Sequence, residues 1–300
     1  MLDQTSIKHE TISIRLPKNS YTNKRAVRRE LMASAPASIV KYLDWNNSLE
    51  VLKNSYNAKL FVLIIGPKGT GKTTLVRKFA DMLGRELFSI NLSLRTRESH
   101  LVGTKTLDNG SVGFVEGMLV KSMRDGGLLY LDELNAAEPD VLLRLDEALD
   151  DRRQIVLKEA EGQVVHAHKD WFVIATINPL THAGTKELPQ QVLSRFPIRI
   201  KLDYPPDDIE LEIIKTHVSM DGIEDDVKRA IRLANSLREA AAVEELYYSP
   251  SIRETIAFTK MIADGTKPKE IAKLVFANVY AQWGDSEYRK VVDLIDSIFE

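Results

Sequence analysis

The sequence predicts an α/β fold built on a parallel five-stranded sheet with flanking helices, followed by a small all-helical domain. Short apolar, β-rich runs alternate with helical patterns up to about residue 204, and only helical patterns follow. Several of these runs are apolar throughout, as strands covered on both faces should be. Strands that alternate with helices in this way favour a parallel sheet.

The individual elements follow from these patterns. Five apolar runs are the predicted strands: 60–65, 87–92, 128–131, 171–176 and 198–202. Between them, residues 72–83 and 139–150 each place four apolar side chains on one helical face. An earlier helix is expected from Pro36, a residue type favoured in a first helical turn, to about Lys53.

Two segments interrupt the alternation of strands and helices. Strand-like runs at 154–158 and 163–167 flank Glu161-Gly162, a pattern that predicts a hairpin. Residues 101–117 are rich in glycine and small polar side chains, and we expect them to form a long excursion from the sheet.

The β pattern stops at Tyr204-Pro205-Pro206. Five helical patterns follow, at 206–218, 225–242, 251–264, 268–283 and 286–299. We therefore expect three regions: a helical or irregular extension over residues 1–58, an α/β domain over 59–204 and a helical domain over 205–300.

The composition excludes several classes of protein. Of the 300 residues, 44% are hydrophobic and 28% are charged, which excludes a wholly disordered chain. No apolar run approaches the roughly 18 residues of a spanning helix, and the first ten residues lack the apolar core of a secretory signal. The absence of cysteine excludes disulfides and thiolate chemistry. We expect a cytoplasmic protein without a membrane partner.

The charge is unevenly distributed. The net charge is −2, with an excess of five positive charges in residues 1–60 and of seven negative charges in residues 205–300. A dedicated nucleic-acid-binding domain is usually strongly basic, so a nucleic-acid partner is not expected.

A phosphate-binding motif lies between the first predicted strand and the first predicted helix. Residues 66–73 fit the spacing GxxxxGK[ST], in which glycines let the backbone amides approach the phosphates. Lys72 is expected to reach the β- and γ-phosphates, and the Thr73 hydroxyl to bind Mg²⁺. The predicted nucleotide-binding residues are Gly66, Pro67, Lys68, Gly69, Thr70, Gly71, Lys72, Thr73 and Thr74. The motif predicts a nucleoside triphosphate and Mg²⁺ as ligands.

A pair of carboxylates follows another predicted strand. Asp132 and Glu133 come directly after the apolar run that begins at Gly126-Gly127. Because the carboxyl ends of parallel strands face the ligand crevice, both carboxylates should lie near the phosphates. Asp132 can assist the Mg²⁺ shell, and Glu133 can act as the catalytic group that polarises the attacking water.

The two motifs resemble those of AAA+ ATPases. Asn178 ends the strand Val173-Ile-Ala-Thr-Ile-Asn178, and the resemblance implies that it is the first sensor, which positions the attacking water. The segment Val192-Leu-Ser-Arg195-Phe196 is similar to the arginine-finger segment, which implies that Arg195 stabilises transition-state charge across a subunit interface. Arg199 competes for this role but lies in a predicted strand. Ser249-Pro-Ser-Ile-Arg253 resembles the second sensor and implies that Arg253 contacts phosphate from its own chain.

Within AAA+ proteins, the chain resembles the MoxR family and its CbbQ/NorQ-type relatives over about residues 58–265. Four segments carry this resemblance: Leu101-Val-Gly103, Phe114-Val-Glu-Gly117, Gly126-Gly-Leu-Leu-Tyr-Leu-Asp-Glu-Leu-Asn135 and Leu202-Asp-Tyr-Pro205. The resemblance implies an insertion near 103–117 and a hairpin near 154–167, where the alternation is interrupted. Ser194 and Lys68 depart from the common pattern, but neither removes a catalytic group.

The resemblance implies a ring-forming ATPase, expected to be a hexamer, that remodels, matures or activates a partner protein complex. Its implied partner is a separate protein with a von Willebrand factor A domain. Two alternatives remain open: a motor or loader that acts on nucleic acid, and a nucleotide-binding scaffold without turnover. The helical domain would then be the lid over the nucleotide.

Overall fold

The computed structural model describes residues 41–108, 111–179 and 186–300, and residues 40–300 belong to one compact unit. The predicted start of a helix at Pro36 lies outside the described residues, as do residues 1–40 of the basic region 1–60. No helix in the described ranges is long and apolar enough to cross a membrane.

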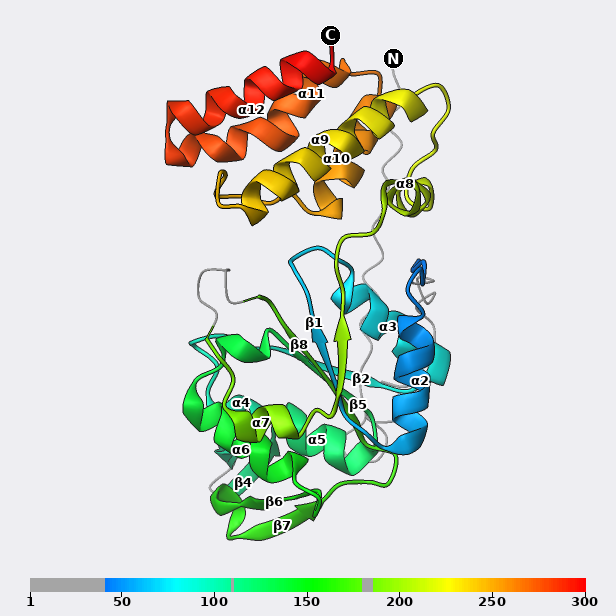
Figure 1. The fold of residues 1–300 in the computed structure, drawn as a ribbon. Helices are drawn as coiled ribbons and strands as arrows, with labels where there is room; N and C mark the ends of the chain where they lie inside the picture. Colours follow the sequence, from blue (N-terminus) through cyan, green and yellow to red (C-terminus); the bar gives the residue numbers. More distant parts are fainter. Residues whose placement is uncertain (1–40, 109–110, 180–185) are drawn as a thin grey trace, which may run out of the picture. The chain divides into compact units, whose positions relative to one another are not determined.

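A five-stranded parallel sheet forms the centre of the α/β part and confirms the predicted fold class (Figure 1). The strands lie in the order β2-β5-β8-β1-β9, with bounds β1 Val62–Ile65, β2 Leu87–Asn91, β5 Leu128–Asp132, β8 Phe172–Ile177 and β9 Ile198–Lys201. Val62 pairs with both Ile174 and Ile198, which places β1 between β8 and β9. The residues of β1, β5 and β8 are almost all buried, as their continuous apolar runs predict.

Helices cover both faces of this sheet. Helices α2 (Ser48–Ala58) and α3 (Lys72–Leu83) lie together on one side, and α4 (Glu98–Leu101), α5 (Met118–Asp125) and α6 (Pro139–Leu149) gather on the other (Figure 1). The short α7 (Gln190–Ser194) leads into β9. One hydrophobic cluster, running from Leu52 to Leu202, joins the sheet to these helices.

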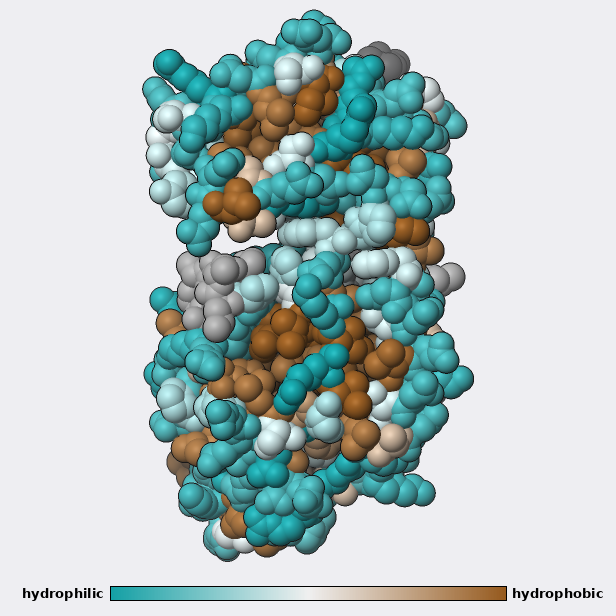
Figure 2. Space-filling view, viewed as in Figure 1, coloured by the Kyte–Doolittle hydropathy of each residue, from teal (hydrophilic) through white to brown (hydrophobic). Residues whose placement is uncertain are grey.

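β9 is one edge of the sheet. Apolar surface gathers around β9 on the face seen in Figure 2 and is crossed by hydrophilic side chains. Arg199 and Lys201 are the exposed residues of β9. Charged side chains on an edge strand disfavour pairing with a strand of another molecule.

The residues after Pro206 are helical and have a hydrophobic cluster of their own, from Leu211 to Phe299. The helices are α8 (Asp207–Lys215), α9 (Glu224–Ala242), α10 (Ile252–Ala263), α11 (Pro268–Ala272) and α12 (Asp285–Ile298). The single helix expected over 268–283 is wrong in detail. After α11 the chain forms a π-helical turn over Lys273–Ala277 and a 3₁₀ segment over Asn278–Trp283.

Two further expectations need correction or refinement. Residues 41–47, which lie within the helix expected over 36–53, are not helical, and α2 begins at Ser48 and runs to Ala58. The Asp44 carboxylate accepts hydrogen bonds from the backbone N–H groups of Ser48 (2.9 Å) and Leu49 (3.0 Å) in the first turn of α2. The excursion at 101–117 contains a regular antiparallel hairpin of β3 (Gly103–Asp108) and β4 (Ser111–Glu116).

The hairpin predicted around Glu161-Gly162 is present. It consists of β6 (Gln154–Leu157) and β7 (Gln163–His166), with a short 3₁₀ turn at Lys158–Ala160. Glu161 and Gly162 both have positive φ, as the turn requires.

Candidate functional site

The phosphate loop, residues 66–73, connects β1 to α3. Gly69 and Gly71 have φ values of 75° and 92°, which glycine adopts without strain. Gly66 packs so closely on the chain after β9 that an added Cβ would lie 2.1 Å from the Leu202 carbonyl oxygen. These glycines let the loop turn tightly into the N-terminus of α3, the end of a helix that attracts anions.

Lys72, the first residue of α3, is only 8% exposed. Its Nζ donates to the carbonyl oxygens of Gly66 (2.6 Å) and Pro67 (2.8 Å) and to Asn178 Oδ1 (3.0 Å). Burial lowers the pKa of Lys72 to about 8, and the carboxylates at the end of β5 oppose this shift. The ammonium group therefore keeps its charge at neutral pH.

Asn178 joins Lys72 to Glu133. Its amide oxygen accepts from Lys72, and its Nδ2 donates to Glu133 Oε1 at 3.1 Å. Glu133 has a left-handed backbone (φ 57°), and its N–H donates to Thr176 Oγ1 at 3.2 Å. Asn135 Nδ2 donates to the Asn178 carbonyl oxygen at 2.9 Å. These bonds hold the predicted catalytic carboxylate and the predicted first sensor in contact.

Oxygen ligands for a divalent cation lie in the same place. Asp132 ends β5, and its Oδ1 accepts a hydrogen bond from Thr176 Oγ1 at 2.6 Å. Thr73 Oγ1 lies 3.1 Å from the Tyr130 hydroxyl. Burial raises the pKa of Tyr130, so its hydroxyl keeps its proton. Carboxylate and hydroxyl oxygens are the donors that Mg²⁺ prefers, so Thr73 and Asp132 fit this ion.

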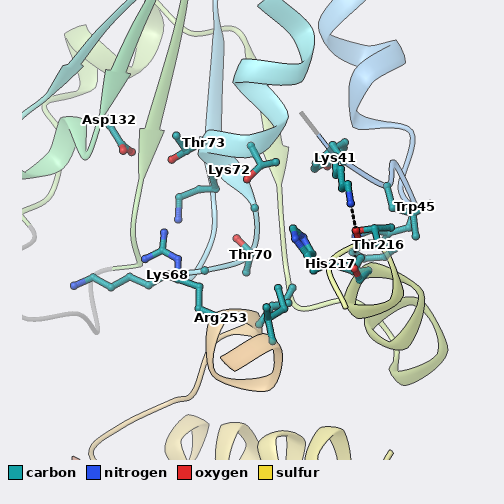
Figure 3. Close-up of a pocket in the computed structure, with 18 of the residues that line it drawn as sticks. Lys41, Trp45, Lys68, Thr70, Lys72, Thr73, Asp132, Thr216, His217 and Arg253 are labelled. Atoms are coloured by element: carbon teal, nitrogen blue, oxygen red, sulfur yellow. Dashed lines mark hydrogen bonds between the residues drawn. The ribbon is translucent and has the colours of Figure 1, made fainter. Parts of the chain in front are cut away.

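These side chains line a cavity of about 470 Å³ (Figure 3). The predicted residues that line it are Lys68, Gly69, Thr70, Gly71, Lys72, Thr73, Thr74, Asp132, Glu133, Asn178 and Arg253. Gly66 and Pro67 contribute instead the carbonyl oxygens that hold Lys72.

A second group of lining residues was not found by sequence reasoning. It comprises Lys41, Tyr42, Leu43, Trp45, Ile213, Thr216, His217, Ile252 and Ile256. The Lys41 ammonium donates to the Thr216 carbonyl oxygen and so joins the segment before α2 to the end of α8 (Figure 3). No motif marks these residues, because apolar and aromatic side chains that line a cavity need no fixed spacing in the sequence.

The three arginines considered from the sequence lie in different places. Arg253 is in the first turn of α10 and lines the cavity. Arg195, after α7, is outside the set of described residues that line it, and its Nε donates to Asp146 Oδ1 of α6 at 2.8 Å. Arg199 lies in β9, as expected, and donates to the Leu193 carbonyl oxygen.

Comparison with known proteins gives the family. An uncharacterized protein of Staphylococcus haemolyticus is 30% identical over 218 residues, which are 70% of this chain and 81% of that protein. A Staphylococcus aureus protein is 32% identical over 182 residues, or 59% of this chain and 68% of that protein. The AAA domain of the dynein-related subfamily matches residues 61–196. The chain belongs to the AAA ATPase family.

A relative from Staphylococcus saprophyticus is 36% identical over 159 residues, which are 51% of this chain but only 59% of that protein's length. A solved structure from Cytophaga hutchinsonii, described as a candidate ATPase, matches with a TM-score of 0.50 and 19% identity. The match covers 94% of this chain and 99% of that one, and it shows a similar fold. The AAA match ends at residue 196, so Arg253 and the helical part lie beyond it.

Proposed function

We propose that this AAA protein binds ATP with Mg²⁺ in the cavity at the phosphate loop, hydrolyses it, and uses the energy to remodel a partner protein complex. The observation that carries the proposal is the contact of Asn178 with both Lys72 and Glu133. A phosphate-binding lysine, a carboxylate and a polar positioning group are thus within hydrogen-bond reach of one another.

Binding rests on charge and on backbone geometry. Lys72 and Arg253 line the cavity together with the loop at the N-terminus of α3, so three sources of positive potential face one space. The aromatic and apolar group around Tyr42 and Trp45 gives the same cavity a surface on which a nucleobase can pack. A nucleoside triphosphate matches this combination of charged and apolar lining.

Mg²⁺ would be held by the Thr73 hydroxyl and the Asp132 carboxylate, together with phosphate oxygens. When bound, the ion supplies charge that offsets the negative charge of the phosphates. Thr176 Oγ1 donates to Asp132 Oδ1, which fixes the orientation of that carboxylate.

In the proposed hydrolysis, Glu133 accepts a proton from the attacking water. General base catalysis of this kind contributes roughly 10²- to 10⁴-fold to the rate. Asn178 holds Glu133 through its Nδ2, and its position favours a role in orienting the same water. Arg195 is proposed to complete the site of a neighbouring subunit, because it lies outside the described lining of its own cavity.

The assembly and the client are proposed from the resemblance to the MoxR family. A finger that acts in a neighbouring site requires a repeated head-to-tail interface, and such interfaces close into rings when the rotation permits. We propose a hexameric ring, a separate partner with a von Willebrand factor A domain, and a protein complex as the client.

Two variants test the core of this proposal. Glu133→Gln keeps the shape of the side chain and removes the carboxylate, so ATP binding should persist while turnover falls by roughly 10²-fold or more. Lys72→Ala should weaken ATP binding in calorimetry, because it removes the ammonium group. Near wild-type turnover of Glu133→Gln would show that another group activates water. Proteins that co-purify with the Glu133→Gln chain in the presence of ATP would identify the client.

A further inference from the structure

We propose that Tyr204 is a positioning residue that couples the phosphate loop to the helix carrying Arg253. This inference rests on the proposed ATP-binding function and adds a regulatory element to that site. Tyr204 lies between β9 and α8, in the segment that connects the α/β part to the helical part.

The first link runs from Tyr204 to the phosphate loop. The Tyr204 hydroxyl donates to the carbonyl oxygen of Lys68 at 3.0 Å. Burial raises the pKa of Tyr204, so the hydroxyl keeps its proton and remains a donor at neutral pH. Lys68 lies at the tip of the loop and lines the cavity. A shift of the loop would therefore strain or release this hydrogen bond.

The second link runs from the Tyr204 ring into the helical part. The Arg238 guanidinium lies over the ring, 4.2 Å from its centroid. Arg238 donates to both carboxylate oxygens of Glu210, at 2.7 and 3.1 Å. Thr255 of α10 donates to the same carboxylate at 2.7 Å. Since Glu210 is fully buried and Arg238 is 7% exposed, this network holds α8, α9 and α10 in one arrangement.

The same network reaches the N-terminus of α10. Arg238 Nε donates to the Pro250 carbonyl oxygen at 2.9 Å. The next residue, Ser251, caps α10 by accepting from the Arg253 N–H at 3.2 Å. Tyr204 therefore contacts the loop through its hydroxyl and contacts the base of the Arg253 helix through Arg238.

A direct contact runs parallel to this link. Gly69 has a φ of 75°, and a Cβ added to it would lie 2.1 Å from Ser251 Cβ. The loop and the start of α10 thus meet with no room for a side chain. The loop and α10 are consequently expected to shift together. The Tyr204 hydroxyl fixes the position of the loop relative to α10, and so sets how closely the Arg253 side chain approaches the phosphates.

Tyr204→Phe tests this directly, because it removes the hydroxyl and keeps the ring under Arg238. A single hydrogen bond has a net worth that corresponds to a change of about two- to tenfold in an equilibrium. We take the phosphate that Arg253 contacts to be the γ-phosphate, which ADP lacks, so the preference for ATP over ADP in calorimetry should fall by about that factor. ADP affinity should change by less than about twofold.

The background Arg253→Ala separates positioning from general destabilisation. If Tyr204 acts through Arg253, then Tyr204→Phe should leave the ATP preference of an Arg253→Ala chain unchanged. An equal loss in both backgrounds, or no loss in the wild-type background, would overturn the inference.

The matched control is Tyr56→Phe. Tyr56, like Tyr204, is half-buried, and its hydroxyl interacts with Arg85. Its ring packs on Phe172, which lies at the opposite end of β8 from Asn178. Tyr56→Phe should leave the preference for ATP over ADP unchanged. If the wild-type chain does not bind ATP at all, the proposed function is refuted and the inference with it. If the wild-type chain binds ATP and Tyr204→Phe leaves the preference for ATP over ADP unaltered, only the inference is refuted.

Discussion

Arg195 allows the sharpest test of action between subunits. Its Nε lies 2.8 Å from Asp146 Oδ1, and this hydrogen bond raises the pKa of Arg195, which keeps the guanidinium charged. The side chain is 28% exposed, so it can approach another molecule. Arg195→Ala should bind ATP almost normally, because the residues of its own cavity remain. Its hydrolysis should fall by about 10³-fold or more if the arginine stabilises transition-state charge.

Mixing two inactive chains reveals whether Arg195 acts across an interface. An Arg195→Ala chain keeps an intact cavity, and a Glu133→Gln chain keeps an intact arginine. In a freely exchanging 1:1 mixture with head-to-tail contacts, about one quarter of the interfaces would combine the two intact halves. The mixture should therefore regain up to about a quarter of wild-type turnover, measured by phosphate release at steady state.

Arg199→Ala is the matched control, since Arg199 lies four residues further along, on β9, and donates to the Leu193 carbonyl oxygen. It should retain activity alone and need no complementation. If an affinity-tagged Arg195→Ala chain retains untagged Glu133→Gln chain on a column, which demonstrates co-assembly, and turnover does not recover, the trans role of Arg195 is refuted.

Two further predictions concern pH and stability. Because the pKa of Lys72 is lowered to about 8, its positive charge is lost as the pH rises through that value. ATP affinity in calorimetry should therefore be about tenfold weaker at pH 9 than at pH 7. A constant affinity would contradict the assignment of Lys72. Glu210→Gln removes the charge opposite Arg238 in a buried pair and should lower the free energy of unfolding in urea by about 3–5 kcal/mol. The exposed pair of Glu224 and Lys228 supplies the control, since Glu224→Gln should change that free energy little, and equal effects would contradict the prediction.

The sheet and the phosphate loop could be predicted from the sequence because their signals are local. Continuous apolar runs specify strands buried on both faces, and the loop requires glycine where φ is positive or where a Cβ would clash. Asp132 and Glu133 could be placed beside the loop because the carboxyl ends of parallel strands meet at one edge. Each of these features is encoded within a few consecutive residues.

Other features depend on contacts between distant segments. The β3–β4 hairpin is a local feature and an exception to this rule, and it was not foreseen because residues Gly103–Asp108 lack a clear apolar alternation. Tyr42 and Trp45 line the cavity only because the segment before α2 is joined to the helical part through Lys41 and Thr216. No periodicity within a segment can reveal a neighbour more than a hundred residues away.

Asn135 connects the predicted water-positioning group to the segment that leads to Arg195. Its side chain, 2% exposed, donates from Nδ2 to the Asn178 carbonyl oxygen, and its backbone carbonyl oxygen accepts from the Lys186 N–H at 2.9 Å. Residues 186–189 lead directly into α7, after which Arg195 follows. Asn135 thus ties the end of β8, where hydrolysis is proposed to occur, to the segment proposed to act on the neighbouring subunit, through its side chain at one end and its backbone at the other. In the proposed ring, a displacement of Asn178 would act on that segment through two hydrogen bonds, from the Asn135 side chain to the Asn178 carbonyl oxygen and from the Lys186 N–H to the Asn135 backbone carbonyl oxygen.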